Sequence, residues 1–125
     1  MTYELTQRFF FEAAHTLARE VEAEGSKRVH GHTYFAELTV AGEPDKRTGM
    51  VMDLARLRAM AEHARSLLDH RLLNEVEGIG PPTLENLCAF LWRAFETQGC
   101  TPARVLVRRE GMGDACTLAA PREKP

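Results

Sequence analysis

Hydrophobic and polar residues alternate along the first third of the chain, and this alternation predicts two β-strands. Successive side chains of a strand point to opposite faces, so an apolar residue at every second position marks a half-buried strand. The first strand covers residues 2 to about 14, and one face of it holds Tyr3, Leu5, Phe9, Phe11, Ala13 and, at the same parity, His15. The second covers about 30–41, and one face of it holds His30, His32, Tyr34, Ala36, Leu38 and Val40.

The middle of the chain shows the spacing of two amphipathic helices. Asp53 and Thr83 each precede such a segment, and both side chains are suited to cap free backbone N–H groups. The buried stripe of the first helix is expected to hold Leu54, Leu57, Ala61, Ala64 and Leu68. That of the second is expected to hold Leu84, Leu87, Cys88, Leu91 and Phe95. Gly99 marks the end of the second helix, and His63 falls outside the first stripe and is expected at the surface.

Two short strands, Val105–Arg109 and Ala115–Ala119, follow the helices. The order ββααββ predicts an α+β fold with two helices on one face of a four-stranded antiparallel sheet. The segment Leu17–Lys27 is too charged for the core and is expected to be a loop. Residues 1–120 are expected to form one domain, followed by a frayed tail at 121–125.

A sheet of this kind leaves two edge strands with unpaired backbone groups, which natural proteins rarely leave uncovered. Association of subunits edge to edge would cover them. We therefore expect a homo-oligomer with sites at its subunit boundaries.

Composition narrows the function classes. The 125 residues are 44% hydrophobic and 27% charged, which is ordinary for a globular protein, and the formal net charge of −2 argues against a nucleic-acid partner. We expect no membrane partner, because no apolar run approaches the length that spans a membrane. We also expect no secretory leader, because the N-terminal residues lack a basic segment followed by an apolar one, and this predicts a cytoplasmic protein. Three widely spaced cysteines, Cys88, Cys100 and Cys116, indicate reduced thiols.

Three histidines form the first candidate site, a metal site. If the first two strands pair antiparallel, His15 meets His30 and His32 at one end of the sheet. Three neutral imidazoles around one point are typical of a catalytic zinc site, with a fourth position left for water or substrate. The competing interpretation is that a His-x-His pair on a strand binds nothing, as most such pairs do.

Asp69 and His70 form a second candidate site. A carboxylate next to an imidazole can orient its tautomer and stabilise its cationic form, which makes His70 a candidate general acid or base. The alternative is a pair at the end of a helix without a chemical role.

Taken together, these residues resemble one family, that of 6-pyruvoyl-tetrahydropterin synthase. Its successive signatures are matched by Phe11-Glu-Ala-Ala-His15, His30-Gly-His32-Thr-Tyr34, Gly49-Met-Val-Met-Asp53, Leu68-Asp-His70, Leu73-Asn74, Pro82-Thr-Leu-Glu-Asn86 and Glu110. They occur in order and span nearly the whole chain. The family includes the bacterial 6-carboxy-tetrahydropterin synthases of queuosine biosynthesis.

The resemblance implies a fold and a set of site residues. The fold would be the tunnelling fold, in which trimers close a barrel of strands and two trimers stack into a hexamer. The family's zinc ligands are matched by His15, His30 and His32, and its catalytic pair, contributed across a subunit interface, by Asp69 and His70. Its pterin pocket is matched by Thr83 and Glu85, which also suit helix capping, and its pterin-anchoring carboxylate by Glu110.

The resemblance also implies a zinc-dependent lyase that acts on dihydroneopterin triphosphate. In one branch of the family triphosphate is eliminated to give a pyruvoyl group. In the carboxy branch a carbon–carbon bond is also cleaved, leaving a carboxylate and releasing acetaldehyde. Basic residues that could neutralise a triphosphate, or simply be solvated at the surface, are Lys27, Arg28, Arg71 and Arg108.

The sequence departs from the family at one catalytic position. The family commonly reads Cys-x-x-x-His-Gly-His, whereas this chain has Ser26 in place of the cysteine. A thiol with a pKa of about 8.5 can supply a base near neutral pH, while an unassisted serine hydroxyl cannot. The explanations are a natural variant with altered chemistry, an engineered substitution, or another base such as Glu24 or Glu22. Some members use glutamate near this position and cleave dihydroneopterin toward a folate precursor.

Two classes of function therefore stay open. The first is a zinc-dependent pterin lyase. The second is a weakly active paralogue that binds a pterin as a binding or regulatory module. The presence of Asp69 and His70 favours the lyase, because a binding module needs no such pair.

Overall fold

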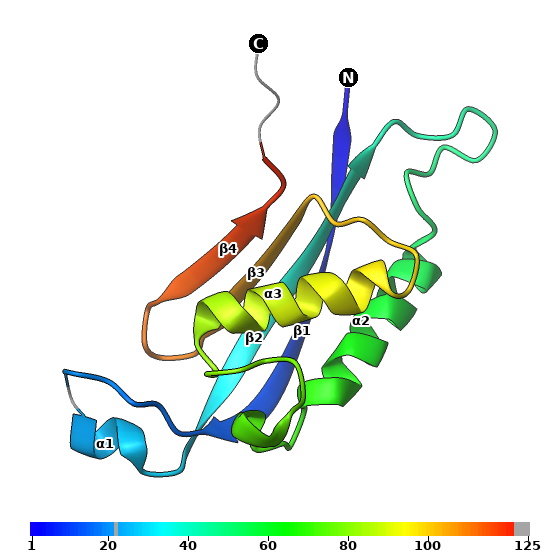
Figure 1. Cartoon of the computed structure of the whole chain (residues 1–125). Helices are drawn as coiled ribbons and strands as arrows, with labels where there is room; N and C mark the ends of the chain where they lie inside the picture. Colours follow the sequence, from blue (N-terminus) through cyan, green and yellow to red (C-terminus); the bar gives the residue numbers. More distant parts are fainter. Residues whose placement is uncertain (22, 122–125) are drawn as a thin grey trace.

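The predicted strands form one antiparallel sheet in the order β1-β2-β3-β4. The computed structural model describes residues 1–21 and 23–121, so the predicted frayed tail lies outside the described residues except for Pro121, and so does Glu22. The elements are β1 (Tyr3–His15), α1 (Ala23–Lys27), β2 (His30–Gly42), α2 (Leu54–Leu68), the 3₁₀ turn η1 (Leu73–Glu75), α3 (Leu84–Glu96), β3 (Arg104–Arg109) and β4 (Ala115–Ala119) (Figure 1). The predicted order of four strands and two long helices is confirmed.

The register of the sheet brings the histidines together. β1 and β2 pair along their whole length, with Phe11 opposite Tyr34 and His15 opposite His30. Both histidines therefore lie at the end of the hairpin that is far from the two chain termini (Figure 1). β3 continues the sheet beyond β2 and places Arg109 opposite Tyr34.

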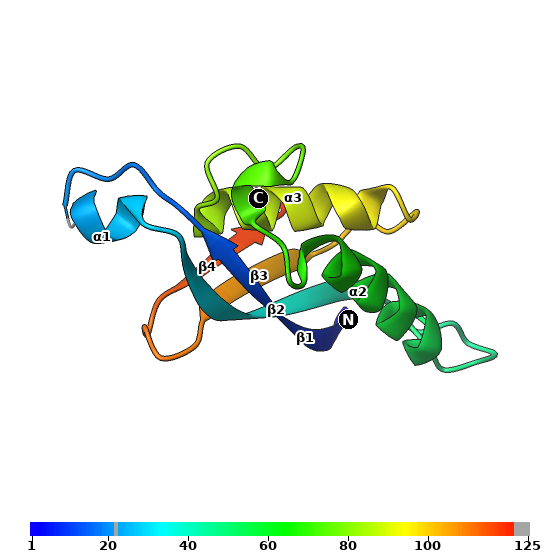
Figure 2. The same cartoon turned by 90° about the horizontal axis from the view of Figure 1, so that it is seen from below.

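Both long helices cover the same face of the sheet (Figure 2). The core between them contains fully buried side chains from both layers, including Phe11, Tyr34, Ala36, Leu38, Val105, Val107, Leu57, Leu68, Leu87, Leu91 and Phe95. The predicted caps are confirmed, because the side chain of Asp53 accepts from the amide of Ala55 and that of Thr83 from the amide of Asn86. Gly99 follows α3 with a φ of +81°, a left-handed conformation that glycine adopts without strain.

The opposite face of the sheet is open. The rings of Phe10 and Phe35 pack there in a tilted arrangement with centroids 6.0 Å apart, and the guanidinium of Arg108 lies 4.4 Å from the centroid of the Phe35 ring. The run of three phenylalanines that interrupts the alternation of the first strand thus serves both faces, since Phe11 is buried in the core while Phe10 is half-exposed. In the part of the chain described here, no helix is long and apolar enough to cross a membrane.

The connection from β1 to β2 differs from the predicted loop. Its second half, Ala23–Lys27, is the short helix α1. Glutamate and lysine are good helix formers, so a segment too charged for the core still forms a helical turn. The predicted surface position of His63 is confirmed, and so is the burial of Cys88. All three cysteines are free thiols, as expected.

Candidate metal centre and its surroundings

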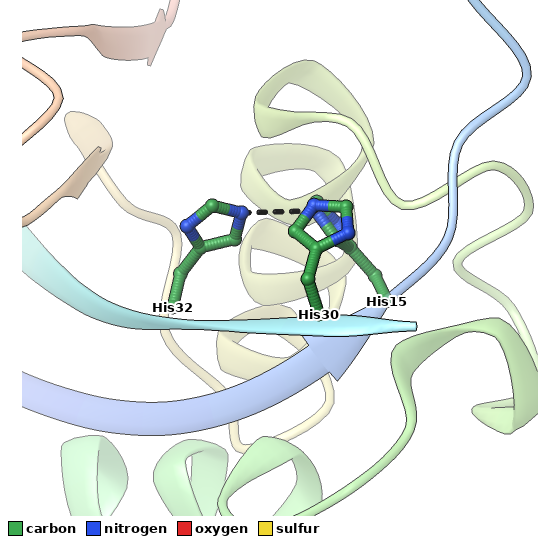
Figure 3. A group of neighbouring side chains, drawn as sticks. All are labelled: His15, His30 and His32. Atoms are coloured by element: carbon green, nitrogen blue, oxygen red, sulfur yellow. Dashed lines mark hydrogen bonds between the residues drawn. The ribbon is translucent and has the colours of Figure 1, made fainter. Parts of the chain in front are cut away.

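Three histidine side chains converge at the end of the β1–β2 hairpin (Figure 3). His15 comes from β1, and His30 and His32 come from β2. The Nε2 atom of His15 lies 3.0 Å from that of His30 and 3.1 Å from that of His32. The three side chains can offer ligand atoms that all lie within 4.8 Å of one another. The cluster predicted from strand parity is therefore present.

Backbone carbonyls fix the orientation of two of the rings. Nδ1 of His15 lies 3.2 Å from the carbonyl oxygen of Pro82, and Nδ1 of His30 lies 2.7 Å from that of Arg28. A carbonyl oxygen only accepts, so in a neutral ring each Nδ1 carries the proton and each Nε2 carries a lone pair. The Tyr34 hydroxyl adds a contact of 3.3 Å to Nδ1 of His15. Such partners commonly orient the imidazole ligands of metals.

These lone pairs fit a metal ion. With both protons on Nδ1, the Nε2 atoms of His15 and His30 face each other at 3.0 Å without a proton between them. That arrangement is repulsive unless a cation lies between the nitrogens. Nitrogen ligands at about 2.1 Å from a tetrahedral zinc ion lie roughly 3.4 Å apart, a few tenths of an ångström more than the two separations found here. The three histidines are therefore suited to hold zinc and to leave a fourth position open.

Burial keeps His15 and His32 in the state that binds metal. Desolvation lowers the pKa of His15 and lowers that of His32 to about 4, and neighbouring positive charge adds to both shifts. At neutral pH both rings are therefore neutral, which is the form that a metal ion requires.

Ser26 lies beside this cluster. Its side chain is buried within α1, and its carbonyl accepts from the amide of Leu17 at 2.7 Å, which ties the helix back to the end of β1. Ser26 lines a cavity of about 290 Å³ together with His30, His32 and Arg109. The position that the family gives to a cysteine is thus next to the candidate metal centre. Glu24, on the same short helix, is exposed.

A second, smaller cavity adjoins the cluster from the side of α3. It measures about 190 Å³, and its lining includes His15, Tyr34, Thr83 and Glu85. Thr83 therefore caps α3 and faces the cavity, so its two predicted roles are compatible. The carboxylate of Glu85 is suited to accept hydrogen bonds from a polar ring that enters this cavity.

Sequence reasoning missed the ion pair between Arg109 and Asp114 at this site. Nε of Arg109 donates to Oδ1 of Asp114 at 2.9 Å, and a second contact joins Nη2 to Oδ2. Arg109 lines both cavities beside the histidines. The alternation of β3 offered a signal, because Val105, Val107 and Arg109 share one parity and therefore one face.

Asp69 and His70 are joined to each other, and neither lines the two cavities at the histidine cluster. Nδ1 of His70 lies 2.8 Å from Oδ2 of Asp69, whose other oxygen accepts from the amide of Glu12 at 2.9 Å. That amide, with Arg65 and His70, lowers the pKa of the Asp69 carboxyl. His70 itself is three-quarters exposed and adopts a φ of +58°. Its ring borders an open groove of about 530 Å³ that His32 also lines.

The remaining predicted residues lie elsewhere. The Glu110 carboxylate contacts Arg108 at 3.2 Å, and Arg108 covers Phe35 on the open face of the sheet, so Glu110 lies toward that face. Lys27 and Arg28 are exposed, and Arg71 lines the groove beside His70. In the described part of the chain, the two cavities at the histidines are lined by none of Glu110, Arg108, Lys27, Arg28 and Arg71.

Comparisons with known proteins assign the class. The model of the 6-pyruvoyl tetrahydropterin synthase family matches residues 4–118, so the chain belongs to this family. A 6-carboxy-5,6,7,8-tetrahydropterin synthase of Synechocystis is 33% identical over 95% of each chain. A dihydroneopterin monophosphate aldolase of Pyrococcus furiosus is 33% identical over 82% of this chain and 84% of its own.

The fold agrees with this assignment. The structure of 6-pyruvoyl tetrahydropterin synthase from Caenorhabditis elegans superposes with a TM-score of 0.82 over 97% of both chains, at 24% identity. The four-stranded sheet and its two helices therefore form the tunnelling fold that the sequence resemblance implied.

Proposed function

We propose that this protein is a zinc-dependent pterin lyase that converts dihydroneopterin triphosphate. The observation that carries the proposal is the convergence of the Nε2 atoms of His15, His30 and His32, in a chain of the 6-pyruvoyl tetrahydropterin synthase family. The two adjoining cavities support it, because together they offer space for a ring on one side and for a polar chain on the other.

Different residues are proposed to bind the zinc ion and the pterin ring. His15, His30 and His32 hold the zinc, and Thr83 and Glu85 bind the ring in the cavity below α3. Zinc lowers the pKa of ligand hydroxyl groups and stabilises negative charge that develops on their oxygens. Tyr34 keeps its proton throughout, because burial raises its pKa to about 12, and it contacts His15 as a neutral group.

Asp69 and His70 supply the proton transfer in this proposal. Asp69 is held by the amide of Glu12 and by Arg65, and it accepts the Nδ1 proton of His70. Nε2 of His70 is then the atom that takes up or returns a proton. Because His70 borders an open groove and lines neither cavity at the histidines, we propose that the pair serves the metal centre of a neighbouring subunit in a hexamer.

A second candidate function is aldolase cleavage with a glutamate as base. The Pyrococcus furiosus relative, named as a dihydroneopterin monophosphate aldolase, favours it, and so does Glu24 on the same short helix as Ser26. Glu24 would need to turn toward the cavity, whereas Ser26 already lines it. We therefore retain the synthase as the main proposal. In either case we expect a cytoplasmic protein, and the carboxy branch would place it in queuosine biosynthesis.

Turnover by zinc-loaded protein tests the proposal. Dihydroneopterin triphosphate, dihydroneopterin monophosphate and dihydroneopterin are each supplied, and the products are identified by mass. Release of triphosphate with a 6-pyruvoyl or 6-carboxy product supports the synthase, and cleavage of the other two substrates supports the aldolase. The control is His32→Ala, which removes a zinc ligand, compared with His63→Ala at an exposed position on α2. Binding of all three pterins without turnover by the parent protein would contradict the lyase and leave a binding module.

A further inference from the structure

Arg109 occupies the inward-facing position at the end of β3. It pairs with Tyr34 across the sheet, and its side chain is only 16% exposed. Buried arginines need a partner, and Asp114 provides one through two parallel contacts to Nε and Nη2. Gly111 and Gly113, both with a φ of +78°, let the connection turn back so that Asp114 reaches Arg109.

The ion pair holds the guanidinium without using all of its donors. An arginine carries five N–H groups, and the fork to Asp114 takes two of them. Its planar shape and fixed direction suit it to bind a second oxyanion. Asp114 therefore positions Arg109 and leaves further N–H groups for a ligand.

The cavity that Arg109 lines has the chemistry of an anion site. Besides Arg109, its lining consists of Arg19, Gly25, Ser26, His30, His32 and Met112, and no carboxylate is among these described residues. The carboxylate of Glu85 lines only the other cavity, whereas Arg109 lines both, so the Ser26 side of the site is the one that offers an arginine without a carboxylate in its lining.

We propose that Arg109, positioned by Asp114, binds a phosphate group on the side chain of the pterin. The assignment rests on the proposed function, because a pterin must occupy the site. It makes Arg109 a specificity-determining residue that favours phosphorylated over unphosphorylated substrates. An arginine cannot accept hydrogen bonds, so Arg109 cannot bind the guanidine-like edge of the pterin ring. It matches an oxyanion instead.

Binding measurements on zinc-loaded protein test this assignment. Calorimetric titrations compare dihydroneopterin triphosphate, dihydroneopterin, pterin-6-carboxylate and inorganic triphosphate. The variants are Arg109→Gln, Arg109→Lys and Asp114→Asn, with Arg104→Gln as the matched control on the same strand, where Arg104 pairs with Glu4 at the surface. Zinc content and thermal midpoint are measured for each variant, so that loss of metal or of folding is recognised.

We expect Arg109→Gln to weaken binding of dihydroneopterin triphosphate and of inorganic triphosphate about tenfold or more, which is about 1.4 kcal/mol. Binding of dihydroneopterin should change less than twofold, Arg109→Lys should lie between the parent and Arg109→Gln, and Arg104→Gln should match the parent. The assignment would be overturned if Arg109→Gln lost affinity equally for all pterins or for none of them. It would also be overturned if the parent bound no phosphate compound. A loss confined to pterin-6-carboxylate would assign the product's carboxylate instead and also overturn it. Failure of the proposed function is a separate result, namely phosphate-selective binding without turnover.

Discussion

Two of the three histidines of the candidate metal centre are oriented by different parts of the chain. The carbonyl of Pro82, which precedes α3, orients His15, and the carbonyl of Arg28, which follows α1, orients His30. His32 lines both the cavity beside Ser26 and the groove beside His70. The ligand set therefore depends on the ends of the helices as well as on the hairpin that carries it.

Replacing His32 tests the ligand set directly. We expect one zinc ion per subunit in the parent and a large loss of zinc in His32→Ala, because two imidazoles with an open side bind zinc much more weakly than three. Metal analysis after dialysis against a weak chelator measures this. The matched control, His63→Ala on the exposed side of α2, should keep full occupancy. Full occupancy in His32→Ala would remove His32 from the ligands.

The pKa of His32 predicts how the metal-free protein responds to acid. Its pKa is about 4 in the folded protein, against 6.5 in the unfolded chain. Between these values the unfolded chain binds a proton that the folded protein does not, so the free energy of unfolding falls as the pH is lowered from 6.5 to 4. The thermal midpoint of the metal-free parent should therefore drop across this range, and that of His32→Gln should drop less. The thermal midpoint of His63→Gln should depend on pH as that of the parent does. If the midpoint of the parent falls no more steeply with pH than that of His32→Gln, the lowered pKa of His32 is contradicted.

Ser26 is the residue at which this chain departs from its family. If it occupies the catalytic-cysteine position, Ser26→Cys introduces a group that ionises near neutral pH beside a metal and a guanidinium. Turnover of dihydroneopterin triphosphate should then rise roughly tenfold, which corresponds to about 1.4 kcal/mol of the barrier. Glu24→Gln should change turnover little. The comparison is made at steady state and at matched zinc occupancy. No gain in Ser26→Cys, together with loss of turnover in Glu24→Gln, would instead favour the glutamate-using branch.

At the scale of secondary structure, patterns between residues close in sequence correctly predicted the strands and the starts of the two long helices. The period of two predicted the strands and the shared face of His15, His30 and His32, and the caps Asp53 and Thr83 predicted where α2 and α3 begin. The helical turn at Ala23–Lys27 differs from the predicted loop, because charge keeps a segment out of the core without preventing it from forming a helix.

The features of the site that the sequence did not predict depend on contacts between residues far apart in the chain. The ion pair of Arg109 with Asp114 depends on how the β3–β4 connection curls, and the orientation of His15 depends on a carbonyl in a distant segment. Asp69 and His70 are held at the outer edge of β1, where Leu72 pairs with Ala14 and the amide of His70 donates to the carbonyl of Glu12. Neither periodicity nor residue spacing encodes these contacts.

Thr83 links helix α3 to the pocket, and a conservative pair of variants separates its roles. Its hydroxyl accepts from the amide of Asn86 at 3.1 Å. Thr83→Ala should lower the free energy of unfolding by about 1 kcal/mol, whereas Thr83→Ser should keep the cap and nearly all of the stability. Urea denaturation of the metal-free protein measures this without a contribution from the ligand. Equal stability of Thr83→Ala and the parent would show that the cap contributes nothing.

The two candidate sites lie at different places on the molecule. His15 shares the buried face of β1 with Phe11 and Ala13, whereas His70 borders a groove that residues of β1, β2 and the segment after α2 line. β1 and β4 are the edge strands of the sheet, and aromatic side chains lie on its open face. Free edges and an open face both favour association, and pairing of edges would bring the groove of one subunit toward another. We therefore predict a hexamer in which each active site uses residues of two subunits.

Mixing two inactive variants tests the shared site in solution. His32→Ala lacks a zinc ligand and His70→Ala lacks the proton-transfer group, so each alone should be nearly inactive. If every site combines the histidine cluster of one subunit with His70 of another, equal mixing after dissociation and reassembly restores about one quarter of the sites. The control mixes the parent with the double variant, in which only the pairing of two parent subunits is active, so about one quarter is again expected. Light scattering at low protein concentration should show a hexamer for the parent and both variants. A stable monomer with full activity, or a mixture of the two variants that stays inactive while the control recovers, would contradict the shared site.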